Sequence, residues 1–472
     1  MKRYEALAEL LATDIRNGRL APGTRLPSIR KLKALHGVSP STVFNAYYRL
    51  EDLGLVRAHE RSGYFVAGSG KTVLREPEPS SSTHLSAEVD ISQLVFSVLG
   101  AMQDRNILPL GSAFPSPRLF PLPRLAKSLA TSARFIDPRE TVASLPPGYS
   151  SLRQQIALRY LGMGMPQAAE QVIITNGALE ALNLCLSAVA CPGDLIAIES
   201  PGFYAAAQAL ERMKMKAIEI PVHPKEGVDL AALERALHAH PIKACWFMTS
   251  FQNPMGTTMS DEAKQALVGL LARHGIPLIE DDVYAELYFG DRQPLPAKAY
   301  DKNGLVMHCS SFSKCLAPGY RIGWVAPGRF GKEIAQLKLM TTLSASLPAQ
   351  AAIADYLQTG GYDKHLRRLR HALEAQLSSL IDAIHRYFPA DVRVSRPRGG
   401  YFLWVEFHAG FDTLQLHRLA VAQGISIAPG PIFSASRQYR NCIRLNFGSP
   451  WRPEFEQALA TLGALIRSIY PG

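Results

Sequence analysis

One stretch, residues 310–324, reads SSFSKCLAPGYRIGW and follows an apolar run that predicts a buried strand. Hydroxyl side chains occupy three of the four positions before Lys314, and Arg321 follows seven residues after it. A lone lysine after a strand is usually an exposed surface residue. Hydroxyls and an arginine around it, however, can hold a phosphate while the lysine amine forms a Schiff base with an aldehyde. The stretch is therefore our first candidate for a site that binds a phosphate and an aldehyde.

Three further motifs lie upstream of this lysine. Residues 175–180, TNGALE, join a strand to a helix whose first backbone N–H groups can receive a phosphate, although such helix starts are often only structural. Residues 253–256, NPMG, form a turn whose Asn253 side chain can donate to a phenolate oxygen, although most Asn-Pro turns are only turns. Residues 280–284, EDDVY, end a buried strand with carboxylates that need a cation or a metal. Because no histidine is near in sequence, we favour a protonated ring nitrogen over a metal.

The chain from residue 91 onward has the pattern of a mixed α/β fold. Short continuous apolar runs alternate with helical stretches, as in residues 172–174 and 178–190. Strands that are buried on both faces and separated by helices indicate a largely parallel sheet. We expect one α/β domain over 91–472. Its large subdomain is expected at about 120–340, and a smaller α+β subdomain at about 341–472 together with the N-terminal segment.

Residues 1–68 have the pattern of a separate, mostly helical unit. Apolar residues recur at helical spacing between Tyr4 and Ile15, and Ser28 and Ser39 stand where the second and third helices need N-caps. A polar turn at 60–63 between two short apolar stretches predicts a β-hairpin. A helix, a helix-turn-helix and a hairpin together predict a winged helix.

Residues 69–90 differ in composition from both neighbours. They contain the run EPEPSSST and few apolar side chains, which predicts a flexible linker between two domains. The formal net charge of the chain is +11, and residues 1–70 carry +5 of it, from eleven Lys and Arg against six Asp and Glu. This density favours a polyanionic partner for the N-terminal unit, although surface helices are often basic.

The composition excludes several classes of protein. Hydrophobic residues make up 47% of the 472 residues and charged residues 19%, which is a globular balance and not that of a disordered or collagen-like chain. Apolar stretches stay far shorter than the roughly 20 residues that a membrane span needs. The six cysteines show neither a CxxC nor a zinc spacing, so we expect no metal site and buried thiols in a reducing cytoplasm.

The order of the motifs resembles that of the fold-type I aminotransferases, which bind pyridoxal 5′-phosphate. Five motifs follow one another within residues 90–472. They are strand-Asn-Gly-Ala, Asn-Pro-x-Gly, Asp-x-x-Tyr, Ser-x-x-Lys with an arginine seven residues on, and Ile-Arg-Leu. The N-terminal unit resembles GntR-type regulators through LPSIRKL at 26–32, VSPSTV at 38–43 and AYYRL at 46–50. Together they resemble the MocR family of transcriptional regulators over the whole chain. The resemblance implies a winged helix-turn-helix followed by a fold-type I α/β domain.

The resemblance to the aminotransferases also implies roles for individual residues. Lys314 would form the internal aldimine, Asp281 would pair with the pyridine nitrogen, and Arg444 would clamp an α-carboxylate. Tyr284 and Asn253 would hydrogen-bond the O3′ oxygen of the ring. The residues implied at the phosphate and its helix start are Gly177, Ala178, Leu179, Ser311, Ser313 and Arg321.

Two neighbouring aromatic residues are candidates for stacking on the cofactor ring. The family usually has a Tyr or Trp there, whereas residues 201–204 read PGFY. Phe203 stands at the expected position and can stack, but it has no hydroxyl to donate, and Tyr204 follows it. We expect Phe203 to be the stacking residue, with core packing as the alternative for this pair.

The GntR resemblance implies that the winged helix binds double-stranded DNA. Donors for phosphates and base edges lie on and around a helix of the size that fits the major groove. They are Arg30, Ser39, Ser41, Thr42, Asn45 and Arg49, with Arg61 at the hairpin tip. The alternative is a winged helix that binds only protein.

We therefore expect a DNA-binding transcriptional regulator of the cytoplasm whose aminotransferase-like domain responds to pyridoxal 5′-phosphate or to an amino compound. The alternative is a working aminotransferase with an attached regulatory domain, because the catalytic set looks intact. A scaffold with an inactive cofactor site is disfavoured, since Lys314, Asp281 and Arg444 are all present. Fold-type I sites are generally built at a dimer interface, so the resemblance also implies a homodimer.

Overall fold

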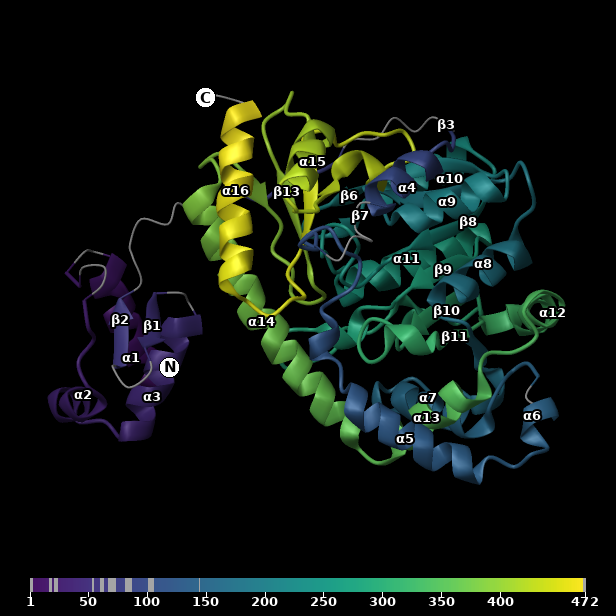
Figure 1. The fold of residues 1–472 in the computed structure, drawn as a ribbon, viewed down its shortest axis with the longest axis horizontal. Helices are drawn as coiled ribbons and strands as arrows, with labels where there is room; N and C mark the ends of the chain where they lie inside the picture. The colour runs from purple at the N-terminus through teal and green to yellow at the C-terminus, as the bar shows by residue number, and fades with distance from the viewer. Residues whose placement is uncertain are drawn as a thin grey trace. The chain divides into compact units, whose positions relative to one another are not determined.

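The computed structural model describes residues 3–16, 19–20, 24–52, 55–59, 63–66, 74–80, 87–100, 106–143 and 145–469. The chain forms two compact units, Met1–Leu74 and Arg75–Gly472, and Figure 1 shows the elements of each. Each unit buries a hydrophobic core of its own. Within the described ranges, no helix is both long enough and apolar enough to span a bilayer.

The first unit is a winged helix, as the sequence predicted. It consists of α1 (Arg3–Arg16), α2 (Ile29–His36), α3 (Pro40–Asp52) and an antiparallel hairpin of β1 (Val56–His59) and β2 (Gly63–Val66). Ser28 Oγ accepts a hydrogen bond from the Lys31 backbone N–H, and Gly37 adopts a φ of 61° at the other end of α2. The serine cap and the left-handed glycine fix where this helix begins and ends.

Helix α3 carries much of the core of this unit on one face. Val43, Ala46, Tyr47 and Leu50 are buried and share a cluster with apolar residues of α1, α2 and the hairpin. Their spacing of three and four residues places them on one side of a helix. The opposite side of α3 is left exposed.

The segment before the second unit is more ordered than its composition predicted. We expected a flexible linker throughout 69–90, but residues 75–80 and 87–90 belong to the second unit. Ser80 Oγ donates to the backbone oxygen of Ser200 at 2.7 Å, and β3 (Ala87–Glu88) pairs antiparallel with β6 (Lys216–His223). β7 (Gly227–Val228) pairs only with the end of β6, so without β3 the start of β6 would be an unpaired edge. Composition does not predict this strand pairing, because backbone hydrogen bonds do not depend on the polarity of the side chains.

The second unit contains a mixed, mostly parallel sheet, as the apolar runs predicted. Its strand order is β3-β6-β5-β8-β9-β10-β11-β4. The remaining strands are β4 (Ile173–Thr175), β5 (Leu195–Ser200), β8 (Ile242–Phe247), β9 (Leu278–Asp281), β10 (Val306–Ser311) and β11 (Gly323–Ala326). β11 is antiparallel to both β10 and β4, so β4 and β10 run in the same direction. Their carboxyl ends therefore lie at the same edge of the sheet.

Helices pack on this sheet (Figure 1). α10 (Leu230–Ala239) and α11 (Asp261–His274) share a core cluster with β5, β6 and β8. α8 (Ala178–Val189) packs on β9, β10 and β11, and its Cys185 Sγ lies 3.5 Å from Cys309 Sγ of β10. Side chains alternate along a strand, so Val306 of the α10–α11 cluster and Cys309 point to opposite faces.

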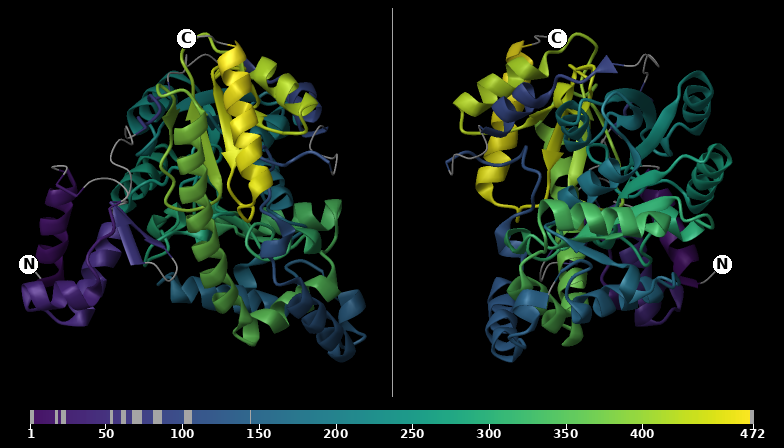
Figure 2. Two further views of the ribbon diagram at one scale, coloured as in Figure 1. Left: turned by 60° about the vertical axis from the view of Figure 1, so that its left-hand side comes forward. Right: turned by 90° about the vertical axis from the view of Figure 1, so that its right-hand side faces the viewer.

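A smaller α+β subdomain follows toward the C-terminus. Its antiparallel sheet has the order β12 (Arg393–Val394), β13 (Phe402–Glu406), β15 (Cys442–Asn446) and β14 (Ala428–Pro429). The helices α14 (Gly361–Tyr387) and α16 (Pro453–Ile469) pack against each other, as Figure 2 shows. A bridge between Leu108 and Ile425 joins an N-terminal segment of this unit to the subdomain. The residues after this bridge run beside β15, where the Asn446 backbone N–H donates to the Leu110 oxygen.

Candidate functional site

The motifs found in the sequence meet at one edge of the main sheet. Asp281 ends β9, Ser311 ends β10 and Thr175 ends β4, and these strands run in the same direction. Asn253 lies in the loop after β8, which is the next strand in the sheet. In open α/β sheets, ligands bind beyond the carboxyl ends of the strands. The topology thus brings together residues that are far apart in the sequence.

Asp281 is fully buried, and neither of its carboxylate oxygens accepts a hydrogen bond of good geometry from the described residues. Burial raises its pKa to about 7, Lys314 opposes this rise, and the neighbouring Asp282 carboxylate adds to it. A buried carboxyl group without a partner is costly unless a ligand supplies a donor or a cation. These free oxygens fit the protonated ring nitrogen that the sequence analysis assigned to Asp281.

Lys314 follows β10 directly, and its amine lies inside the site. Nζ donates to the backbone oxygen of Ala113 at 2.9 Å and lies 3.8 Å from the ring centroid of Phe114. Burial lowers the pKa of Lys314 to about 7, although the Asp281 carboxylate opposes this shift. Desolvation disfavours the charged form, so burial favours the neutral amine. The neutral amine is the form that attacks an aldehyde.

The residues expected to hold a phosphate surround the N-terminus of α8. Gly177 adopts a φ of 83°, and a Cβ on it would lie 2.5 Å from Nη2 of Arg321. Arg321 Nη1 donates to Ser313 Oγ at 3.3 Å. A Cβ on Gly323 would lie 2.6 Å from the backbone nitrogen of Ala178, so this contact also requires glycine. A guanidinium, a hydroxyl and the first N–H groups of a helix together form a cradle that fits a phosphate.

Ser311 and Leu179 lie next to this cradle and play different parts in it. Ser311 is buried, and its Oγ accepts from the Ser313 backbone N–H at 3.2 Å, which shapes the turn before Lys314. The Leu179 side chain is 46% exposed in the first turn of α8. Its backbone N–H is the group that the helix start leaves available to an anion.

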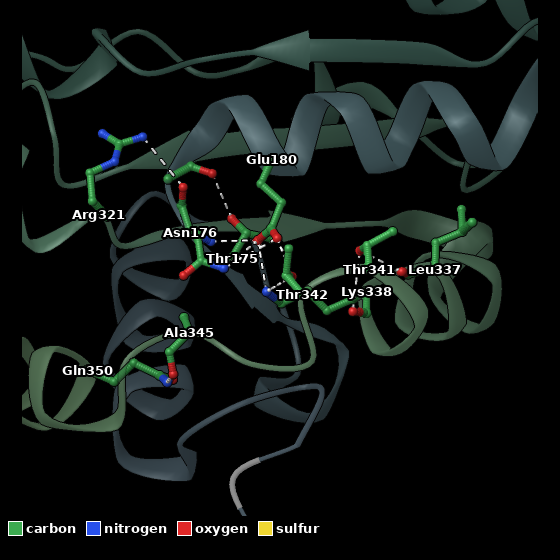
Figure 3. A network of polar contacts seen from close by, with 11 residues as sticks. Thr175, Asn176, Glu180, Arg321, Leu337, Lys338, Thr341, Thr342, Ala345 and Gln350 are labelled. Carbon is green, nitrogen blue, oxygen red and sulfur yellow. Dashed lines mark hydrogen bonds and ion pairs between the residues drawn. The ribbon is translucent and has the colours of Figure 1, made fainter. Parts of the chain in front are cut away.

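A polar network that the sequence analysis missed holds the start of α8 (Figure 3). Glu180 accepts from the Asn176 backbone N–H at 2.6 Å, from Nζ of buried Lys338 at 2.8 Å and from the Thr342 hydroxyl. Burial alone would raise the pKa of Glu180, but the hydrogen bonds from Lys338 and Thr342 hold it below its usual value. This network ties α8 to α12 (Gly331–Thr341). No local pattern could reveal it, because Glu180 and Lys338 are 158 residues apart.

Asn253 and Tyr284 are both buried in the site. Asn253 Oδ1 accepts from Arg444 Nη1 at 2.9 Å, while its Nδ2 has no partner in the described part of the chain. The ring of Tyr284 packs edge-on against Tyr401 and lies 6.0 Å from Lys314 Nζ. Burial raises the pKa of Tyr284, so its hydroxyl keeps its proton. An unpartnered amide N–H and a protonated hydroxyl are both able to donate to a phenolate oxygen.

The two candidates for ring stacking have different surroundings. Tyr204 begins α9 (Tyr204–Arg212), is buried and packs 6.1 Å from the ring of Phe433. Phe203 precedes the helix, is half-buried and lies 4.9 Å from the Tyr204 ring. Tyr204 is thus engaged in the core, and Phe203 stays our candidate for the stacking residue.

Arg444 lies in β15 and is fully buried. Nη2 donates to the backbone oxygens of Gly111 at 2.6 Å and Ser112 at 3.2 Å, and the guanidinium lies 4.1 Å from the ring centroid of Phe402. Its Nε lacks a partner among the residues that the structure describes. Carbonyl oxygens carry only partial charge, so a carboxylate would form stronger bonds at the same guanidinium.

Residues 111–114, which we call the crossing segment, link Arg444 to Lys314. The backbone oxygen of Ala113 accepts from Lys314 Nζ and from the Tyr401 hydroxyl at 3.1 Å. Asn446 Nδ2 donates to the backbone oxygens of Ser112 and Phe114, each at 2.8 Å. No motif in the sequence marks this segment, because its contribution comes from backbone oxygens that any sequence provides.

The carboxylate cluster at 280–284 has a neighbour that the sequence did not place there. We found no histidine nearby in sequence, but His308 of the adjacent strand β10 lies with Nε2 2.9 Å from Asp282 Oδ2. Its Nδ1 lies 2.6 Å from the Tyr160 hydroxyl. In the ranges that the structure covers, no group of three His, Cys, Asp or Glu residues could hold a metal ion. His308 therefore acts as a partner of Asp282.

Three of the DNA-binding candidates are exposed side chains of the winged helix. Arg30 lies on α2, and Asn45 and Arg49 lie on the exposed side of α3. Arg61, expected at the hairpin tip, lies outside the described residues. The three exposed side chains combine charge and hydrogen-bond donors on one unit, as contact with phosphates and base edges requires.

The other three candidates form a hydroxyl cluster at the start of α3. Ser39 Oγ lies 2.8 Å from the hydroxyls of both Ser41 and Thr42 and accepts from the Thr42 backbone N–H at 3.1 Å. Ser39 is therefore the N-cap of the helix. Its hydroxyl is already engaged, whereas Ser41 keeps an exposed side chain.

A winged helix together with this site on an α/β sheet defines a regulator with a helix-turn-helix domain and an aminotransferase-like domain. Residues 112–462 match the family described as aminotransferase class I and II, and residues 3–66 match the bacterial regulatory proteins of the gntR family. The chain belongs to the aminotransferase class I and II family, with a GntR-type helix-turn-helix domain, which is the MocR-type combination. This membership supports pyridoxal 5′-phosphate as its cofactor.

Two regulators align with the chain over nearly its whole length. The uncharacterized HTH-type transcriptional regulator YdcR of Escherichia coli is 47% identical over 467 residues, which cover 99% of each chain. The uncharacterized regulator YjiR of the same organism is 38% identical over 473 residues, again 99% of each. Among solved structures, LysN, an α-aminoadipate aminotransferase of Thermus thermophilus complexed with N-(5′-phosphopyridoxyl)-L-leucine, is 27% identical. It matches 81% of this chain and 96% of its own, with a TM-score of 0.73.

Proposed function

We propose that this regulator binds DNA through its winged helix, holds pyridoxal 5′-phosphate covalently at Lys314 and responds to an α-amino carboxylate. One observation carries the proposal: an unpartnered, buried carboxyl group at Asp281 shares its site with a lysine amine whose pKa burial lowers to about 7. The same chain contains a GntR-type domain. We place its action in the cytoplasm, where a bacterial chromosome is accessible.

Different residues of the site would bind different parts of the cofactor. When bound, pyridoxal 5′-phosphate supplies an aldehyde carbon and an electron-withdrawing ring. Asp281 would keep a proton on the ring nitrogen, and Asn253 and Tyr284 would donate to the ring oxygen. Arg321 and Ser313, with the first N–H groups of α8, would bind the phosphate.

The response to a ligand would act through the crossing segment. An α-carboxylate on Arg444 would displace the backbone oxygens of Gly111 and Ser112, which now accept from that guanidinium. When the cofactor is bound, Lys314 Nζ would keep at most one N–H, which would turn toward the cofactor and away from the Ala113 oxygen that it now contacts. Cofactor and effector would therefore both release contacts to the same segment. Contacts that differ between two states are what allow a ligand to shift their populations.

We also propose a homodimer. Three large apolar side chains are highly exposed. They are Phe135 at the end of α5 (Leu122–Phe135), 82% exposed, Val142 in α6 (Glu140–Ala143), 81% exposed, and Met340 in α12, 72% exposed. Large apolar side chains that stay this exposed are candidates for contact with another chain. A second copy would also provide two winged helices for a paired operator.

The DNA-binding part is tested by Arg30→Ala and Arg49→Ala. Both side chains are exposed, and each phosphate contact that is lost should lower the log–log slope of affinity against salt by about 0.9. Fluorescence anisotropy at several salt concentrations measures the slope, with duplexes that the wild-type chain selects from a random-sequence library. Arg19→Ala is the matched control, because Arg19 is exposed and pairs with Asp14 of α1. Unchanged affinity and slope in both test variants would favour a winged helix that binds only protein.

The lowered pKa of Lys314 predicts how cofactor capture depends on pH. The free amine is the reacting form, so the rate of covalent capture should rise as pH increases through about 7 and then level off. Asp281→Asn removes a charge that raises this pKa, so the midpoint should move to lower pH. Timed borohydride trapping at saturating cofactor gives the rate. A rate that keeps rising to about pH 10, as for an ordinary lysine, would contradict the assignment.

A second candidate function is transamination by the same site. It is favoured by the neutral Lys314 amine beside Asp281 and by Arg444 as a carboxylate ligand. Production of keto acid from a panel of amino acids, compared with Lys314→Ala, decides whether the site turns over.

A further inference from the structure

Two aromatic side chains of α3 are partly exposed. Phe44 is 40% exposed and Tyr48 is 53% exposed. Their rings are 6.3 Å apart and nearly parallel, at 25° to each other. They lie on the side of the helix opposite the buried Val43 and Ala46, so neither ring contributes to the core of the winged helix. Only polar residues of this helix are predicted from the sequence to contact DNA, and the aromatic pair is not among them.

The surroundings of the pair indicate what would cover it. Asn45 and Arg49, which alternate with the two rings along the helix, are exposed donors, and the first carboxylate of α3 is Glu51 near its end. Residues 1–70 carry a net charge of +5. An apolar patch between cations and donors fits a polyanion that also offers apolar groups. The major groove of DNA has one such apolar group, the C5-methyl of thymine.

Tyr48 has two aromatic neighbours in the winged helix. Tyr64 on β2 lies close enough to Tyr48 for the two side chains to interact. Phe44 stacks on the Tyr48 ring one helical turn away. A ring that has neighbours on its own unit loses less side-chain entropy when it makes a further contact.

Resting on the proposed DNA-binding function, we propose that Phe44 and Tyr48 are specificity-determining residues that contact thymine methyl groups in the operator. Four residues of an α-helix span about 6 Å, which corresponds to about two base-pair steps of 3.4 Å. Operators should therefore have thymines within about two steps of each other where α3 lies in the groove. Asn45 and Arg49 supply the polar contacts beside them.

The experiment compares thymine with uracil, which differ only by the methyl group. The full chain first selects duplexes from a random-sequence library, and each is then prepared with deoxyuridine in place of single thymines. For the wild type, loss of a contacted methyl should weaken binding by roughly fourfold. Phe44→Ala should bind the thymine duplex more weakly and should no longer distinguish thymine from uracil at its position.

Three further variants separate the apolar contact from other effects. Phe44→Leu keeps an apolar side chain and should keep part of the thymine preference. Leu35→Ala removes a 71% exposed side chain of α2 and should leave the thymine-to-uracil ratio unchanged. Arg49→Ala should weaken binding to both duplexes by the same factor, since charge does not sense the methyl group.

The outcomes distinguish this inference from the proposed function. A wild-type chain that binds both duplexes equally, or a folded Phe44→Ala variant with an unchanged thymine-to-uracil ratio, would overturn the role of the aromatic pair and leave DNA binding intact. A wild-type chain that selects no duplex at all would overturn the proposed DNA binding. Circular dichroism of Phe44→Ala confirms that the winged helix is folded.

Discussion

Lys314→Ala should abolish covalent attachment of pyridoxal 5′-phosphate completely. Its amine is the group in the site whose pKa burial lowers to about 7, and alanine leaves no nitrogen at that position. Borohydride reduction of the loaded wild type, followed by peptide mass spectrometry, should place one pyridoxyl group on the peptide that contains Lys314. The same treatment of the variant should yield none, while thermal unfolding shows that the fold is kept.

Lys264 provides an internal control for this experiment. It is also buried, and burial lowers its pKa, but its Nζ donates to Ser250 Oγ at 2.8 Å and to the Leu295 backbone oxygen at 2.6 Å. Its peptide should stay unlabelled in both proteins. A pyridoxyl group at wild-type stoichiometry in Lys314→Ala would show that another lysine carries the cofactor.

Arg444→Ala should keep the cofactor and DNA binding but lose the response to an amino acid effector. A coupling of about 1–3 kcal/mol would change operator affinity about 5- to 150-fold in the wild type. Without the guanidinium there is no charged ligand for the α-carboxylate, so the change should fall below about twofold. Titration of an amino acid that is active on the wild type, with labelled operator duplex present, measures both values.

Because Arg444 is fully buried, a second variant guards against a damaged fold. Arg444→Lys keeps the charge but cannot form two parallel bonds to a carboxylate, so it should show a reduced response. Arg437→Ala is the surface control, because Arg437 is half-exposed and pairs with Asp90. A full effector response in Arg444→Ala would show that Arg444 is not needed for the response.

The sequence by itself determined the two-unit plan and the parts of the cofactor site that follow single strands. Capping at Ser28, the period of apolar residues in α3 and the apolar runs of the sheet are local signals. Local hydrogen bonds and side-chain alternation depend on nearest neighbours along the chain, so such signals survive in a sequence read alone. In a largely parallel sheet, the order of the motifs also implies that their strand ends share one edge.

The tertiary structure alone decided what surrounds those residues. The crossing segment 111–114 reaches Arg444 from more than 300 positions away, and His308 joins Asp282 because β10 lies beside β9. The residues at 75–80 and 87–90 were expected to be linker but pack on the second unit.

For charge and exposure too, the sequence names the residues and the tertiary structure decides their state. Lys314 and Asp281 could be named from their motifs, but their pKa values near 7 result from desolvation by the whole fold. Phe44 and Tyr48 could be assigned to a helix, but only the packed unit shows that no core covers them. Burial is a property of all elements packed around a residue, whereas a sequence motif records only the residues beside it in the chain.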